Sequence, residues 1–90
     1  MVRHIDILIK ANLRNKGYAF LTLKQADKYD IKGTVSYTPE DNIFIEAEGE
    51  VTDLDKLVNW CKSNMLETRN TEIIVEQNKC KNLTEFEILI

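Results

Sequence analysis

The chain has 90 residues, of which 43% are hydrophobic and 30% are charged, and these proportions predict one small globular domain over residues 1–90. No apolar stretch approaches the roughly 20 residues of a membrane-spanning helix, and charges interrupt the first apolar run, so we expect a cytoplasmic protein that does not bind membranes. Residues 1–33 carry +4 (seven Lys and Arg less three Asp) and residues 34–90 carry −7 (five less twelve). This distribution favours attraction of a small anion to the first third of the chain and repulsion of a polyanion by the rest.

The first third of the chain predicts a strand followed by a helix. In residues 4–11, isoleucines at every second position alternate mainly with polar residues, which is the pattern of a half-buried strand. A polar loop then ends at Gly17. Over residues 19–30 the alternation is absent, and Leu23, Ala26 and Tyr29 have the spacing of one face of a short helix.

The rest of the chain predicts a hairpin, a second helix and two further strands. Residues 33–38 and 42–48 are strand-like and flank a turn that contains Pro39. Thr52, with Asp55 three residues later, is a variant of the capping box and predicts the start of a helix. The inner stripe of that helix is Leu54, Leu57, Val58, Cys61 and Met65. The last two predicted strands, separated by a turn, are residues 71–77 and 85–90.

This order of elements predicts the fold class. A β-α-β-β-α-β chain with an extra C-terminal strand has the order of the ferredoxin-like α+β sandwich. We therefore expect an antiparallel sheet with two helices on one face.

Residues 16–23, KGYAFLTL, agree at six of eight positions with an octamer of RNA-recognition domains. In those domains the octamer forms a strand whose aromatic rings stack on bases, whereas here it spans a loop and the start of a helix. The sheet face predicted to be open also carries Asp6, Glu46 and Glu48, which repel phosphates. The sequence therefore predicts no binding of nucleic acid.

The same loop contains a second motif. The segment from Ala11 to Ala19 reads ANLRNKGYA, and a strand, a polar loop ending in Gly and a helix start can cradle a phosphate with backbone N–H groups. Further matches follow in order and are Gly33, Val35, Pro39, Ala47-Glu48-Gly49, Leu54, Leu57, Trp60, Phe86 and Ile88. With these residues the chain resembles the acylphosphatase family, small βαββαβ enzymes that hydrolyse carboxyl-phosphate anhydrides without a metal or a cofactor.

The resemblance implies that the two chemical groups of the family are replaced in this chain. It places the phosphate-binding Arg of the family at Ala19 and the water-positioning Asn at Tyr37. A methyl group then replaces a charged, forked donor, and a phenol replaces an amide that both donates and accepts. Because removing one preorganised donor costs roughly 10²–10³ in rate, we expect an acylphosphatase-like domain that is catalytically silent.

The loop is nevertheless expected to bind a small anion, either phosphate or a phosphorylated metabolite. The candidate anion-binding residues are Leu13, Arg14, Asn15, Lys16, Gly17 and Tyr18. The alternative is an active acylphosphatase in which Arg14 or Lys16 replaces the Arg of the family. Neither hypothesis requires a cofactor.

The other candidate residues predict no metal site. His4 and Asp6 share one face of a strand, where we expect a surface ion pair. Cys61 and Cys80 lack the spacing of a zinc motif and are expected to be reduced thiols.

Leu8 and Phe44 are apolar residues among charges on the face predicted to be open. Single exposed apolar residues are ordinary on protein surfaces. We therefore expect a monomer or a weak homodimer, and an unidentified protein partner is left open.

Overall fold

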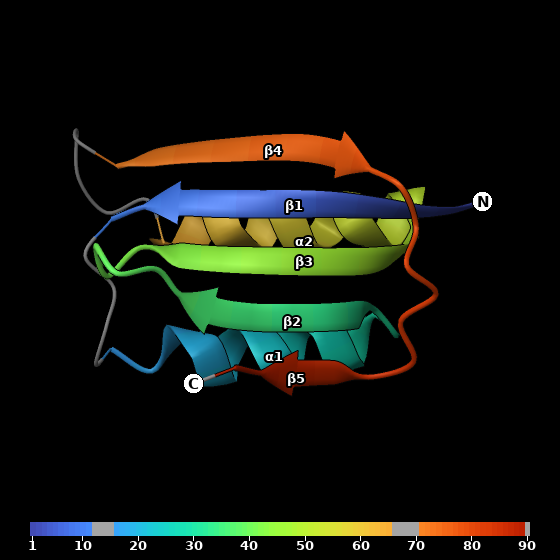
Figure 1. The fold of residues 1–90 in the computed structure, drawn as a ribbon, viewed down its shortest axis with the longest axis horizontal. Helices are drawn as coiled ribbons and strands as arrows, with labels where there is room; N and C mark the ends of the chain where they lie inside the picture. Colours follow the sequence, from blue (N-terminus) through green and yellow to red (C-terminus); the bar gives the residue numbers. More distant parts are fainter. Residues whose placement is uncertain (12–15, 66–70, 90) are drawn as a thin grey trace.

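The computed structural model describes residues 1–11, 16–65 and 71–89, which form a five-stranded sheet with two helices packed on one face (Figure 1). In chain order the elements are β1 (Val2–Lys10), α1 (Tyr18–Lys28), β2 (Lys32–Tyr37), β3 (Ile43–Glu50), α2 (Val51–Met65), β4 (Glu72–Asn78) and β5 (Phe86–Ile88). Among these described residues, neither helix combines the length and the apolar character that crossing a bilayer requires.

The strands lie in the order β4-β1-β3-β2-β5. β1 pairs antiparallel with both β3 and β4, and β2 pairs antiparallel with β3. These pairings and the two helices confirm the predicted ferredoxin-like α+β fold. β5 differs from the predicted antiparallel sheet because it is parallel to β2. The chain leaving β4 crosses the whole width of the sheet first, so it enters β5 in the direction of β2 (Figure 1).

The core lies between the sheet and the helices and uses alternate residues of the central strands. Ile7 and Ile9 of β1 and Ile45 of β3 are fully buried, because successive strand side chains point to opposite faces. Tyr29 and Trp60 pack against this core. The stripe predicted for α2 is confirmed, with Val58 partly buried and with full or nearly full burial of Leu54, Leu57, Cys61 and Met65.

The ends of two elements differ from prediction. α2 begins at Val51, directly after β3, so Thr52 lies in the first turn of the helix rather than at its N-cap. The predicted capping box was wrong because the strand passes into the helix without an intervening loop. β1 begins at Val2, since its pairing with β3 extends to Glu50.

The segment after β4 covers part of the sheet face that was predicted to be open. Residues 79–85 run past the end of the sheet from β4 to β5 (Figure 1). The backbone N–H groups of Lys81 and Leu83 donate to the carboxylate of Glu48 on that face, and Glu48 is only 3% exposed. The prediction of an open face was therefore wrong at this end of the sheet.

Farther along the same face, Leu8, Phe44 and Ile74 line a hollow of about 230 Å³ together with two acidic residues, Asp6 and Glu76. Leu8 and Phe44 are half-buried, because each has a neighbouring strand on both sides. A homodimer through this face stays a prediction.

Candidate functional site

β1 ends and α1 begins at the same end of the molecule (Figure 1), and the loop predicted to bind an anion connects them in the chain. β2 ends on the same side of the molecule as the start of α1. Ala19 is the second residue of α1 and Tyr37 is the last residue of β2. The fold therefore brings the two positions that the resemblance singled out to the end of the molecule where β1 ends and α1 begins.

The structure describes some of the predicted loop residues and not others. Leu13, Arg14 and Asn15 lie outside the described residues. Lys16 and Gly17 are exposed and immediately precede α1. Their role in anion binding stays a prediction.

Gly17 is the N-cap residue of α1 and has a left-handed backbone conformation, with φ 77° and ψ 10°. Its carbonyl oxygen accepts the hydrogen bond of the Leu21 N–H at 3.1 Å. Gly17 has no side-chain oxygen that could cap the first turn, and that turn contains no acidic residue. No carboxylate in the first turn of α1 therefore offsets the positive end of the helix dipole. A positive helix end of this kind attracts anions.

Tyr18 ties the start of α1 to the end of α2. Its hydroxyl donates to the carbonyl oxygen of Asn64 at 2.8 Å. One turn later the buried Thr22 hydroxyl donates to the Tyr18 carbonyl oxygen at 2.7 Å. The Tyr18 side chain therefore positions the helix that begins at the loop.

Ala19 and Tyr37, at the positions where the resemblance places the catalytic groups of the family, have side chains that pack with the core. Ala19 is 8% exposed and belongs to the buried cluster, and Tyr37 is half-buried against it. Tyr37 pairs with Ile43 next to the turn that connects β2 to β3. In that turn the Thr38 N–H donates to the Asn42 carbonyl oxygen at 2.8 Å. Neither position carries a positive charge.

A second cluster of titratable groups lies on the sheet face away from the helices. His4 is fully buried. Its Nδ1 lies 2.6 Å from Glu48 Oε2, and its Nε2 lies 3.0 Å from Asp6 Oδ1 and 3.6 Å from Glu46 Oε1. The predicted contact with Asp6 is present, but the prediction of a surface pair was wrong because this histidine has no exposed surface.

Glu48 is the centre of this cluster. It accepts hydrogen bonds from the His4 ring and from the backbone N–H groups of Lys81 and Leu83, at 2.6, 2.5 and 3.0 Å. Burial on its own raises the pKa of Glu48, but the two backbone hydrogen bonds and the ring outweigh burial and hold this pKa below its ordinary value. The alternation of charged residues in β1 and β3 signalled a charged face, whereas the covering segment had no local signal.

His4, Asp6 and Glu46 each place one ligand atom within 4.8 Å of the others, so in the described part of the chain they are the group that could hold a metal ion. The Lys81 ammonium already lies 2.5 Å from Glu46 Oε1 and adds positive charge beside these carboxylates. The cluster has the composition of an internal ion network. The expectation of no metal stays a prediction.

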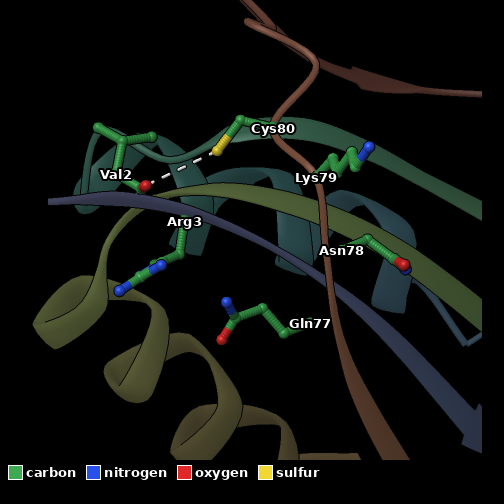
Figure 2. A pocket seen from close by; sticks show the side chains of 6 residues that line it. All are labelled: Val2, Arg3, Gln77, Asn78, Lys79 and Cys80. Atoms are coloured by element: carbon green, nitrogen blue, oxygen red, sulfur yellow. Dashed lines mark hydrogen bonds between the residues drawn. The ribbon is translucent and has the colours of Figure 1, made fainter.

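The two cysteines have different environments. Cys80 is exposed and lies in a hollow of about 470 Å³ at the start of β1, with its Sγ 3.6 Å from the carbonyl oxygen of Val2 (Figure 2). The other residues lining this hollow are Arg3, Gln77, Asn78 and Lys79. Cys61 is fully buried in the core. Since β1 ends at the loop, the hollow lies at the opposite end of the strand from the candidate anion site.

We expect one fast-reacting thiol per chain. Burial raises the pKa of Cys61 to about 12, so about one part in ten thousand of this thiol is ionised at pH 8, and the thiolate is the reactive form. Titration of the folded protein with an aromatic disulfide reagent should show rapid reaction of Cys80 and slow reaction of Cys61. The Cys80→Ser variant should lose the fast phase; a fast phase that persists would contradict the assigned burial.

Comparisons with known proteins agree with the fold. Residues 5–88 match the sequence profile of the acylphosphatase family. An acylphosphatase of Acaryochloris marina is 28% identical over 85 residues, covering 94% of this chain and 91% of that protein. An acylphosphatase of Archaeoglobus fulgidus is 27% identical over 84 residues, covering 93% and 94%. The crystal structure of the Bacillus subtilis acylphosphatase has the same fold, with a TM-score of 0.86 and 20% identity over 100% of both chains.

Proposed function

The chain belongs to the acylphosphatase family, and from this membership we propose that it is a non-hydrolysing member that binds a small anion at residues 11–19. The anion is phosphate or a phosphorylated metabolite. The observation that carries the proposal is the pair Ala19 and Tyr37, which stand where the family resemblance places the phosphate-binding Arg and the water-positioning Asn.

The absence of those two groups bears directly on catalysis. Phosphoryl transfer depends mainly on positioning and on stabilising the charge of the transferred group. The Ala19 methyl group has no hydrogen-bond donor, and the Tyr37 ring packs against the core. Removing one preorganised donor costs roughly 10²–10³ in rate, so the loss of both groups leaves little turnover above the uncatalysed reaction.

Anion binding has separate support. Gly17 holds the left-handed turn that begins α1, and the first turn of this helix contains no acidic residue. A helix N-terminus attracts an anion through its N–H groups and its dipole. The net charge of +4 over residues 1–33, from seven basic and three acidic residues, adds long-range attraction for a small anion.

The exposed position of Lys16 at the start of α1 favours one alternative, an active enzyme that uses a loop cation. In that alternative Arg14 or Lys16 replaces the family Arg. The residue that does so then becomes essential for turnover.

The proposal predicts hydrolysis of a simple acyl phosphate at the rate of a blank without protein, together with saturable binding of inorganic phosphate. Titration of ¹⁵N-labelled protein with phosphate should shift the amide signals of Ala11, Gly17 and Ala19. The amide of Gly33, which lies in β2, should stay unchanged. Sodium chloride at matched ionic strength is the control.

The hydrolysis assay and the phosphate titration test separate parts of the proposal. Turnover well above the blank would refute the silent enzyme, and loss of that turnover in Arg14→Ala or Lys16→Ala would establish the alternative. Unchanged loop amides at saturating phosphate would refute anion binding, whatever the hydrolysis rate.

A further inference from the structure

The face of the sheet away from the helices is a surface that the proposed function does not use. Figure 1 views this face, with α1 and α2 behind the sheet. Residues 79–85 cover its end beside Glu48, and the described part of the chain leaves the middle of the face uncovered. Because successive strand side chains point to opposite faces, the strand registers determine which residues lie side by side on it.

Three apolar side chains form one row across the middle of this face. In the register of the sheet, Leu8 of β1 lies between Ile74 of β4 and Phe44 of β3. All three are half-buried, and with Asp6 and Glu76 they line the hollow of about 230 Å³. Pockets for small molecules usually measure about 300–1,000 Å³. The hollow is therefore better suited to one large side chain of a protein partner, the kind of contact that anchors an interface.

The next row along the strands is acidic. Asp6 of β1 pairs with Glu76 of β4 on one side and with Glu46 of β3 on the other. Glu87 of β5 lies in the same row, two strands beyond Glu46. Four carboxylates thus lie along one line across the sheet, directly beside the apolar row.

Positive charges at the acidic row are fewer than the carboxylates. Lys81 Nζ lies 2.5 Å from Glu46 Oε1, and the His4 ring lies 3.0 Å from Asp6 Oδ1. Even with a charged ring, these two cations leave the row negative. A second copy of the chain would bring the same acidic row to this face, whereas a partner with Lys or Arg at matching positions is attracted to it. Charge complementarity therefore favours a basic partner over self-association.

The geometry of the face favours a helix as the contacting element. β1 and β3 each have a hydrogen-bonded strand on both sides, so the middle of the face offers side chains for contact rather than backbone groups. A segment that binds here must satisfy its own backbone hydrogen bonds, as a helix does. The two rows are two residues apart along the strands, about 6.6 Å, and one helical turn advances about 5.4 Å. A helix lying along the strands therefore places side chains one turn apart over the two rows.

We propose that the hollow at Leu8, Phe44 and Ile74 is the anchor site for a basic amphipathic helix of a partner protein. The helix inserts one large apolar side chain into the hollow and places Lys or Arg, three or four residues away, against Asp6 and Glu76. Burial of the apolar side chain supplies the attraction, and the charged pairs set the direction of the helix and exclude acidic partners. This binding requires neither the anion site nor hydrolysis at residues 11–19.

The test is a titration of the ¹⁵N-labelled full chain with a helical peptide of alanine that carries one tryptophan, with lysines three and four residues from it. The amides of Leu8, Phe44 and Ile74 should shift and reach saturation. Those of Ala26 and Leu57, which are buried in the helices behind the sheet, should stay unchanged. A matched peptide with glutamate at each lysine position should bind at least roughly tenfold more weakly, and added salt should weaken binding of the lysine peptide.

Two variants and a control test the two rows separately. Glu76→Lys, at an exposed position, reverses one charge of the acidic row and should weaken binding of the lysine peptide roughly tenfold. Phe44→Thr removes the ring from the hollow, keeps a side chain suited to a strand and should weaken binding by a similar factor. Asp27→Lys makes the same change of charge on α1, behind the sheet, and should leave the affinity unchanged. Thermal unfolding checks that each variant is folded at the temperature of the titration.

Several outcomes would overturn the proposal. One is the absence of saturable shifts at Leu8, Phe44 and Ile74, and another is equal affinity for the lysine and glutamate peptides. A third is an equal loss of affinity in Glu76→Lys and Asp27→Lys. A fourth is a shift of the same three amides when the protein alone is concentrated, which would assign this face to contact between copies of the chain.

Discussion

Exchanging Ala19 for Arg and Tyr37 for Asn together is expected to raise acyl-phosphate hydrolysis at least about 100-fold above the natural chain. Each change restores a group that the family resemblance places there, and one preorganised donor in a phosphate site is worth roughly 10²–10³ in rate. The measurement is the initial rate with a simple acyl phosphate at saturating concentration. Each single variant should gain much less, because the two groups act on one transition state.

The matched control is Ala19→Met with Tyr37→Asn, which adds a long uncharged side chain at the same buried position. Ala19 is 8% exposed, so thermal unfolding must first show that both double variants are folded at the assay temperature. Equal rates in the Arg and Met variants would show that the guanidinium charge is not what the loop lacks. A folded Arg variant at the blank rate would mean that the phosphate cradle itself has been lost.

Replacing Gly33 with Ala is expected to lower the free energy of unfolding by about 3–5 kcal/mol, from steric overlap and backbone strain together. A Cβ at this position would lie 1.8 Å from the Glu46 backbone oxygen and 2.7 Å from its carbonyl carbon, and the backbone φ is +150°. In a domain of this size such a loss lowers the Tm by at least about 12 °C. Thermal and urea unfolding followed by circular dichroism measure both quantities.

Gly17→Ala is the comparison for this prediction. Gly17 also has a positive φ, +77°, but a Cβ there meets no atom within 4 Å. Its replacement should cost only the strain of a left-handed residue, about 1–2 kcal/mol. Equal stability of Gly33→Ala and Gly17→Ala would contradict the close approach of β2 to β3 at Glu46.

The elements and their order could be predicted from local patterns. The alternation around Ile7 and Ile9 predicts β1, and the stripe from Leu54 to Met65 predicts α2, because burial against one neighbouring layer imposes a period of two on strands and 3.6 on helices. The positions of Ala19 and Tyr37 followed from ordered matches along the chain. The start of α2 was missed because Thr52 has capping chemistry, whereas continuous pairing of β3 to Glu50 takes the chain directly into the helix.

The environment of His4 could not be predicted in this way. Its alternation with Ile5 placed it correctly on the face away from the helices, and a charged residue two positions later suggested an exposed pair. Its environment is set by Glu48, a partner 44 residues away in β3, and by residues 79–85 after β4, where the Lys81 N–H donates to Glu48. Local patterns carry no information on contacts over that separation.

Composition, periodicity and the order of motifs thus predicted an α+β domain, the acylphosphatase resemblance and the uncharged residues that this resemblance places at its two catalytic positions, because each can be read from residue patterns along the chain. The tertiary structure decided that Ala19 and Tyr37 lie at the same end of the molecule, that β5 runs parallel to β2, and that a buried histidine lies among three carboxylates. These features depend on which strands become neighbours and where a long connection crosses them. That choice is made by the free energy of burying the whole sheet rather than by any one segment.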